Sequence, residues 1–407
     1  MSTTHHTKRS ELIRSFHDAG DVLRSSLKQS RLIGCLSPFV IALRDILTNA
    51  GIEVDRINLP ASKIFGFRHP LYRIANITWS RDQDLDVHNT PHPEREMTRE
   101  ELHVIVKESP YASILSQDQR YMRVDLRREE QTYSLLQKLK SQGYQDYLGI
   151  GITLPSGMTQ PLSIAARRPF PAYISEYVDM LQPLLSLCLD SLYQGHAASS
   201  LAQSYIGNRT GLRVLAGDFV RGRTQMIKAG ILFCDIRGFT SLSENLGAVG
   251  VVSVVNQIFE VIGQVVQTHG GEILKFIGDA ILIIFADQDE ARHQSMINAM
   301  ISTVKESLQE VHALGAQLNL PLSIGFGAHV GEVLYGNIGT PLRLDFTVMG
   351  PAVNLASRLE SLCKTLGVSS VFSSEVVCGD SPLKPLGSEV VKGIAEPVKV
   401  WGLDSAG

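Results

Sequence analysis

The sequence predicts a protein of the α+β class, built from two domains that are joined by a helical connector. Its 407 residues are too many for one ordinary core. Short strand-like runs lie among amphipathic helical stretches in both halves, and a long helical stretch separates the halves. We therefore predict an N-terminal domain over residues 1–173, a connector over 174–223 and a C-terminal domain over 224–407.

Charge and cysteine content limit the possible partners and compartments. The formal net charge of −3 is close to neutral for this size, which gives no support for a nucleic-acid partner. The five cysteines are scattered without a CxxC pair, as expected of reduced thiols in a cytoplasmic protein. The first residues, MSTTHHTKRSEL, lack the apolar stretch of a signal peptide. We expect a cytoplasmic protein.

The most apolar long window, Val251–Val266, does not meet the requirements of a membrane span. It is short for a span and contains polar residues such as Asn256 and Glu260. At helical spacing its apolar residues fall on one face, from Val251 and Val254 to Ile258 and Ile262. The window predicts a core helix and no transmembrane segment.

The N-terminal domain is predicted to be a mixed α/β domain. A helix is expected over Ser30–Ala50, where Gly51 provides a stop, and a second over Glu129–Gln142. Pro155-Ser156-Gly157 favours a hairpin turn, whereas the polar stretch Asp82–Glu101 is interpreted as an exposed loop. The strand-like runs are Leu71–Trp79, Tyr121–Leu126, Tyr147–Leu154 and Leu162–Ala166.

This layout, together with the connector, resembles GAF- or PAS-type sensor modules, although no diagnostic motif supports the likeness. A regulatory or dimerising domain without a small ligand explains the pattern equally well. An unknown small ligand or protein partner therefore stays open for this domain. In the connector, helical Ile174–Tyr193 passes through the small-residue run Gly195–Ser200 into Leu201–Arg223.

The first motif of the C-terminal domain is a strand that delivers a carboxylate to a tight turn. Ala229–Asp235 is apolar and ends in Asp235, and the turn Ile236–Thr240 leads into a helix over Ser241–Leu246. Backbone N–H groups at a helix start favour phosphates, and an Asp there can hold a divalent cation. Gly238, Phe239 and Thr240 are therefore candidate phosphate-binding positions.

The second motif is a hairpin with another carboxylate. Strand-like Glu272–Phe276 and Ala280–Phe285 meet at Gly278-Asp279, a favoured hairpin turn. Asp279 can be a simple turn residue. With Asp235 it can instead bind two Mg²⁺ ions that assist phosphoryl transfer.

The third motif is a helix start after Gly350-Pro351. From Ala352 the helix carries Asn354 and Arg358 four residues apart, hence on one face. An amide and a guanidinium side by side suit a ribose oxygen and a phosphate. Most Asn/Arg pairs at this spacing simply face solvent.

Together, FCDIRGFT, KFIGD and DFTVMGPAVNLASRLE resemble the class III adenylyl and guanylyl cyclases over Lys228–Leu403. The resemblance implies a catalytic domain with a ferredoxin-like βαββαβ core. It implies two Mg²⁺ or Mn²⁺ ions per site, held by Asp235, Ile236 and Asp279. It also implies that Lys275 and Thr347 read the purine, that Asn354 orients the ribose and that Arg358 contacts the phosphate in the transition state.

The purine-reading pair predicts ATP as the substrate. Lys275 can only donate a hydrogen bond, which suits N1 of adenine, and Thr347 can accept from the N6 amine. Guanylyl members of the family place an acidic residue at the position of Lys275. The sequence therefore predicts an adenylate cyclase, regulated by the N-terminal domain, with a guanylate cyclase or a catalytically silent nucleotide-binding domain as alternatives.

A diguanylate cyclase is disfavoured, because Gly270-Gly271-Glu272-Ile273 lacks the second acidic residue and the Phe of that family's hairpin. Active sites of class III cyclases lie between two catalytic domains, and this chain carries one. The resemblance thus implies a head-to-tail homodimer with two equivalent sites.

Overall fold

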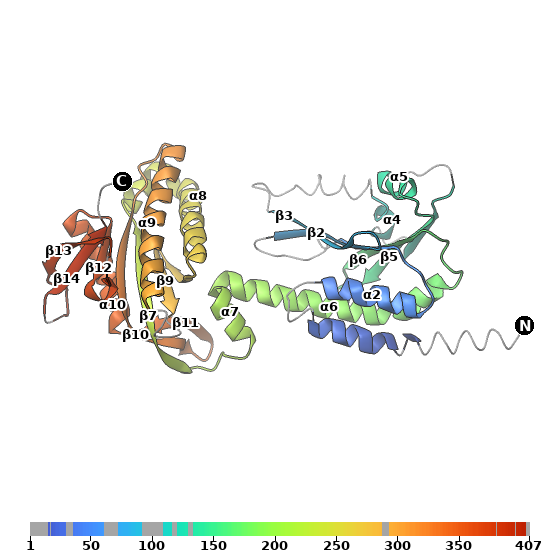
Figure 1. The fold of residues 1–407 in the computed structure, drawn as a ribbon, viewed down its shortest axis with the longest axis horizontal. Helices are drawn as coiled ribbons and strands as arrows, with labels where there is room; N and C mark the ends of the chain where they lie inside the picture. The colour runs from blue at the N-terminus through green and yellow to red at the C-terminus, as the bar shows by residue number, and fades with distance from the viewer. Residues whose placement is uncertain are drawn as a thin grey trace, which may run out of the picture. The chain divides into compact units, whose positions relative to one another are not determined.

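The computed structural model describes residues 15–16, 18–29, 36–60, 72–91, 109–115, 120–128, 133–286, 293–379, 381–394 and 396–403. The chain divides into two compact units, Met1–Leu201 and Ala202–Gly407, and each has its own sheet (Figure 1). The division falls inside the predicted connector. The described cysteines, Cys188, Cys234, Cys363 and Cys378, form no disulfide.

The N-terminal unit contains a six-stranded antiparallel sheet with the strand order β3-β2-β1-β6-β5-β4. The four predicted strands are confirmed, and the hairpin joins Thr153 to Thr159 as expected from its Pro-Ser-Gly turn. The strands are β1 (Arg56–Leu59), β2 (Tyr72–Ser80), β3 (Asp84–Pro91), β4 (Tyr121–Asp125), β5 (Asp146–Thr153) and β6 (Thr159–Ala166).

Two features of this sheet differ from the prediction. The stretch expected as a loop over Asp82–Glu101 contains the edge strand β3, while residues 92–101 lie outside the described residues. The polar composition of β3 does not predict a strand, because an edge strand can expose both faces to water and then lacks the apolar alternation. The four-residue strand β1 was not predicted, since it is too short for its alternation to stand out.

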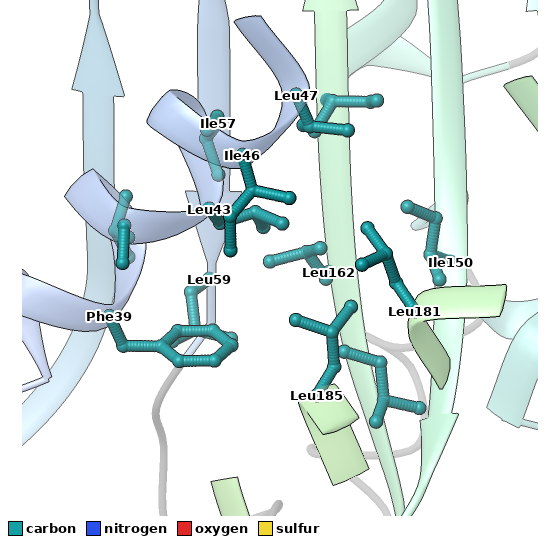
Figure 2. Packing of buried hydrophobic residues seen from close by; sticks show 14 of the residues in the cluster. Phe39, Leu43, Ile46, Leu47, Ile57, Leu59, Ile150, Leu162, Leu181 and Leu185 are labelled. Carbon is teal, nitrogen blue, oxygen red and sulfur yellow. The ribbon is translucent and has the colours of Figure 1, made fainter. Parts of the chain in front are cut away.

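One face of the sheet is covered by α2 (Ser37–Asn49) and α6 (Ile174–Ile206), the former lying within the predicted helix over Ser30–Ala50. Figure 2 shows Phe39 and Leu43 of α2 and Leu181 of α6 pointing toward the apolar side chains of the strands. The other face receives Leu136 and Leu139 of α5 (Ser134–Ser141) and the short helix α4 (Ala112–Leu115). The small residues Gly195–Ser200 do not interrupt α6.

The C-terminal unit is built on the predicted βαββαβ core. Its central strands follow the order β10-β7-β9-β8, with every neighbouring pair antiparallel, and the chain runs β7–α8–β8–β9–α9–β10. The strands are β7 (Thr224–Ile236), β8 (Glu272–Ile277), β9 (Ala280–Ala286), β10 (Ile324–Thr340), β11 (Arg343–Met349), β12 (Ser370–Ser373), β13 (Leu383–Glu389) and β14 (Val398–Leu403).

Helices cover both faces of this sheet. The helices α8 (Phe239–Thr268) and α9 (His293–Leu318) pack on the face that carries Leu232, Cys234 and Ile283. Alternation along the strands sends Ile231 and Leu282 to the opposite face, where α10 (Pro351–Leu366) and α7 (Asn208–Leu215) lie.

By length and composition α8 is apolar enough to cross a membrane, which alone is weak evidence for a span. The helix is kinked at Gly247, and its second part has the apolar face predicted from the sequence. Val251, Val254, Ile258 and Ile262 are buried in the core of the unit. The prediction of a core helix is confirmed.

Candidate active site

The two predicted metal-binding carboxylates lie next to each other at one end of the sheet. Asp235 is the last but one residue of β7 and pairs with Ala280, and Asp279 directly precedes Ala280 in the turn of the β8–β9 hairpin. Antiparallel pairing therefore brings two residues 44 positions apart in sequence (279 minus 235) to the same edge. Burial and the neighbouring negative charge of Asp279 raise the pKa of Asp235.

The chain then turns into α8 through a glycine in the left-handed region. Gly238 has φ 66° and ψ 23°, so that it caps the helix in the left-handed region, and α8 begins at Phe239. The Leu242 N–H donates to the Gly238 carbonyl at 3.0 Å. The N–H groups of Phe239 and Thr240 stand in the first turn, where a helix offers them no acceptor. They are placed to receive an anion beside Asp235.

Sequence reasoning missed an ion pair beneath this edge. Arg237 Nη2 lies 2.9 Å from Glu360 Oε1, and both side chains are largely buried, with 22% and 13% exposed. The guanidinium lies over Gly325 of β10, where a Cβ atom would come within 1.8 Å of Nη2. Burial, and after it the charges of Asp235 and Asp279, raise the pKa of Glu360 to about 6, while Arg237 opposes the rise.

Arg237 only partly offsets the effect of burial and of Asp279 on the pKa of Asp235, because it is paired with Glu360. Its guanidinium also points at the Glu360 backbone carbonyl, 3.4 Å away, while Glu360 Oε1 accepts no aligned hydrogen bond from the residues that the structure describes. The arginine is thus engaged with Glu360. A hint of this pair was present in the sequence, since both residues lie inside the motifs around Asp235 and Arg358.

Lys275 lies on β8 and pairs with a residue that sequence reasoning did not single out. Its Nζ atom is 2.5 Å from Asp345 Oδ2 on β11, whereas its predicted partner Thr347 is 7% exposed on the same strand. Asp345 and Thr347 are two positions apart, so their side chains share one face of β11. The sequence did contain a signal for this pair, namely Asp345, an acidic residue two positions before Thr347.

Asn354 and Arg358 lie on α10, as predicted, and face away from the sheet. Ala352 and Ala356 are buried against the strands, whereas Asn354 is exposed and Arg358 is partly buried. Among the described residues, Arg358 forms no ion pair, and its guanidinium lies against Gly393. An unpaired guanidinium beside an exposed amide can receive a phosphate and a ribose oxygen.

Asp235, Asp279 and the turn at Gly238 lie together at one edge of the sheet. Lys275 is paired with Asp345 on the strand that carries Thr347, while Asn354 and Arg358 lie on α10. Within the described ranges, no hydrogen bond or ion pair joins these strand and helix residues to the two carboxylates.

Comparisons with known proteins identify the family of the C-terminal unit. Residues 223–401 match the family model of the adenylate and guanylate cyclase catalytic domain. An adenylate cyclase of Anabaena cylindrica is 37% identical over 179 residues, which are 43% of this chain and 35% of that protein. The chain therefore spans well under two thirds of that relative.

Solved structures of two similar proteins each cover just under half of this chain. The adenylyl cyclase CyaB from P. aeruginosa is 30% identical, with a TM-score of 0.41 over 46% of this chain and 97% of that one. The guanylyl cyclase Cya2 is 33% identical, with a TM-score of 0.39 over 45% and 96%. The family match, the relative and the motifs agree: the C-terminal unit of this chain belongs to the class III adenylate and guanylate cyclase family.

Proposed function

We propose that the C-terminal unit is an adenylate cyclase, which converts ATP to 3′,5′-cyclic AMP and pyrophosphate. The observation that carries the proposal is the pair of close carboxylates, Asp235 and Asp279, beside a helix start that can receive phosphates. Two like charges held together in a partly buried site fit a bound cation, because a divalent ion relieves their repulsion.

Asp235 and Asp279, together with the backbone carbonyl of Ile236, would hold two Mg²⁺ or Mn²⁺ ions. Within the described chain, no group of three or more acidic, His or Cys side chains is placed to hold a metal ion, so phosphate oxygens and water would complete the coordination. When bound, such ions lower the pKa of an attacking hydroxyl and neutralise charge on the phosphates.

The remaining residues bind and orient the nucleotide. The 3′-hydroxyl oxygen forms a bond to the α-phosphorus and its proton passes to solvent water, while the bond from that phosphorus to the β-phosphate oxygen breaks and pyrophosphate leaves. Asn354 would fix the ribose, and Arg358 would stabilise the charge that grows on the α-phosphate. The N–H groups of Phe239 and Thr240 would hold the outer phosphates.

Base choice depends on the order of donor and acceptor at the purine edge. Adenine presents the acceptor N1 beside the N6 donor, whereas guanine presents the N1–H donor beside the acceptor O6. Lys275 facing N1, with Thr347 or Asp345 accepting from N6, selects adenine. If Lys275 instead donated to O6 and Asp345 accepted from N1–H, the same pair would suit guanine. A guanylate cyclase is therefore the second candidate.

The direct test is incubation of the purified full chain with ATP or GTP and Mn²⁺ or Mg²⁺. We expect cyclic AMP, with a preference for ATP of at least about 10²-fold, because a mispaired buried polar edge costs a few kcal/mol. Turnover of GTP as fast as ATP would contradict the adenylate assignment. A chain that binds ATP but forms no cyclic product would instead be a silent nucleotide-binding domain.

We also propose that two copies build each site head to tail. Asn354 and Arg358 face away from the sheet that carries Asp235 and Asp279, so a second copy can bring them to the carboxylates. Asp279→Ala and Asn354→Ala should each be inactive alone. Mixed in equal amounts, they should recover about a quarter of wild-type activity, since half of the dimers then have one intact site. A mixture that stays inactive despite subunit exchange would contradict the shared site.

Finally, we propose that the N-terminal unit regulates catalysis through α6. This helix buries Ile174 and Leu192 in the N-terminal core and ends at Ile206, which packs in the C-terminal unit. One alanine inserted between Ala198 and Ser199 rotates the following helix by about 100° and should change the basal rate. Seven inserted residues nearly restore the rotation and should restore more of that rate. Equal rates in all three proteins would argue against α6 as the link.

A further inference from the structure

The short helix α7 is bonded to the strands that carry the proposed base-reading residues. Thr210 is fully buried, and its backbone N–H and hydroxyl both donate to Glu272 Oε1, at 3.0 and 2.9 Å. Since that hydroxyl has one hydrogen, it accepts from the Tyr335 hydroxyl at 3.0 Å. Glu272 opens β8 three residues before Lys275. The helix is thereby anchored to β8 and β10.

One turn later, Arg213 lies against the strand β11. Its guanidinium carbon is 5.3 Å from the centre of the Tyr335 ring and 5.2 Å from that of Phe346, within the range of cation–π attraction. The two rings meet edge to face with centres 4.8 Å apart. Arg213 Nη2 is also 2.6 Å from Asp218 Oδ2. The cation is therefore held at a fixed place on two buried rings.

The loop after α7 is tied down as well. Asn337 of β10 is 2% exposed, and its Nδ2 donates to the Asp218 carbonyl at 2.8 Å. Two backbone bonds join the same asparagine to the loop, from the Gly222 N–H to its carbonyl at 3.0 Å and from its N–H to the Arg223 carbonyl at 3.1 Å. Because Asp218 holds Arg213, these bonds fix the arginine through its partner.

Phe346, which contacts Arg213, lies on β11 among the residues proposed to read the base. Phe346 stands between Asp345 and Thr347 on β11, so its ring leaves the strand on the face opposite to theirs. Arg213 thus holds β11 from behind the residues proposed to read the base. Thr210 similarly holds the start of β8, and a register shift between Ile273 and Lys275 separates that start from Lys275.

We propose that α7 positions the base-reading residues, with Arg213 and Thr210 as positioning residues for Asp345, Thr347 and Lys275. This inference rests on the proposed function of the C-terminal unit and extends it to residues that do not touch the nucleotide. Small displacements of aligned groups change reactivity and selectivity strongly. Loss of the anchor should therefore weaken recognition of adenine and leave Asp235 and Asp279 unaffected, since Asp235 lies on β7 and Asp279 follows the end of β8 that is opposite to Glu272.

The test compares Arg213→Met with Arg209→Met in the full chain. Arg209 is exposed on the same helix, so the control removes the same charge without the ring contacts. Equilibrium binding of fluorescent ATP and GTP analogues gives the base preference, and initial rates give KM, kcat and the Mn²⁺ requirement. We expect Arg213→Met to raise KM for ATP and to lower the preference for ATP, each about tenfold. Its kcat should stay within about threefold, at an unchanged Mn²⁺ requirement.

A second pair of variants, both at Thr210, controls for effects of misfolding. Thr210→Val removes the hydroxyl and should weaken the ATP preference, whereas Thr210→Ser keeps the hydroxyl and should restore it. If both arginine variants show the same base preference, or if melting temperature and kcat fall while the preference is unchanged, α7 merely packs and the inference is overturned. Absence of cyclic product from the wild type would refute the proposed function separately, and the binding ratios would still decide on α7.

Discussion

Asp146 in the N-terminal unit and Asp235 in the C-terminal unit are both carboxylates on sheet strands, yet their surroundings are opposite. Asp146 is 4% exposed and accepts hydrogen bonds from Arg123 Nη2 at 2.7 Å and from the Phe170 N–H at 2.8 Å. Asp235 is partly buried beside Asp279, and both burial and that charge raise its pKa. A carboxylate whose partners belong to the fold stabilises the fold, whereas one held beside a like charge is a candidate for binding a ligand.

The largest expected effect comes from removing one charge of the repelling pair. Asp279→Asn should lower cyclase activity at least about 10³-fold, because the proposed metal site loses a ligand. The same change removes the like charge beside Asp235, so the protein should melt at the same or a higher temperature. Activity assays with Mn²⁺ and thermal melting measure the two effects.

An exposed acid provides the control for this substitution. Glu310 lies on α9, is exposed and is remote from the carboxylate pair in the sequence. Glu310→Gln removes one negative charge and should leave the rate within about twofold, as substitutions of exposed charges usually do. An Asp279→Asn protein that keeps more than a tenth of wild-type activity would contradict the metal-binding assignment.

The next largest effect is expected from changing Lys275, whose positive charge is paired with Asp345. Lys275→Glu alone would place a carboxylate beside Asp345, so it should be combined with Asp345→Asn and Thr347→Cys. The triple variant should lose at least about tenfold in ATP turnover and gain relative activity with GTP, because a carboxylate accepts from guanine N1–H. The ratio of kcat/KM for the two nucleotides measures the change, and an unaltered ratio would exclude Lys275 from base reading.

Local patterns in the sequence predicted those parts of the site that are close in the chain. The β8–β9 hairpin with Asp279 in its turn follows from two apolar runs around Gly278-Asp279, and α10 follows from the breaker Gly350-Pro351. The βαββαβ order and the roles of the residues came from the family resemblance. The family match confirms the resemblance, whereas the roles stay predictions.

Contacts between distant segments could not be predicted in the same way. Lys275 and Asp345 meet because β8 and β11 come together, and no local pattern specifies that meeting. The Arg237–Glu360 pair likewise depends on α10 packing across β10. Strand β3 was missed for another reason, since its polar residues follow the pattern of a loop when no neighbouring strand is known.

A third prediction tests Asp146, the carboxylate whose hydrogen-bond partners belong to the fold. Asp146→Ala leaves the Phe170 N–H without its acceptor and Arg123 without its ion-pair partner, and should lower the stability of the N-terminal unit by about 2–3 kcal/mol. The arginine is 37% exposed, so water screens part of the loss and the higher values of fully buried pairs do not apply. Denaturant unfolding of the full chain measures the change.

The exposed pair of Arg127 and Asp125 is the matched control. It lies on the same sheet at the end of β4, with 57% and 32% of the side chains exposed. Asp125→Ala should shift the unfolding midpoint far less than Asp146→Ala, since water replaces an exposed partner at little cost. Equal shifts would show that burial does not distinguish the two carboxylates, and the comparison with Asp235 would lose its basis.

The smallest effect is expected at His329, a buried ionisable group that is neither fully paired nor repelled. It lies on β10 with 8% exposed, its Nδ1 atom is 2.8 Å from Ser373 Oγ, and Glu375 Oε2 is 3.5 Å away. Burial lowers the pKa of His329, and the negative charge of Glu375 opposes this only in part. The folded protein therefore favours the neutral imidazole.

Because the pKa of His329 is lower in the folded than in the unfolded chain, its contribution is complete above about pH 6.5 and is lost as the pH falls. Each pH unit between the two pKa values removes up to about 1.4 kcal/mol. Glu375, whose pKa is also lowered, stays ionised in this window and adds nothing to the slope. Denaturant unfolding at pH 7.5, 6.5 and 5.5 should show a shallower acid loss in His329→Gln than in the wild type. The same loss in both proteins would mean that folding leaves the pKa of His329 unchanged, because the negative charge of Glu375 then offsets burial completely.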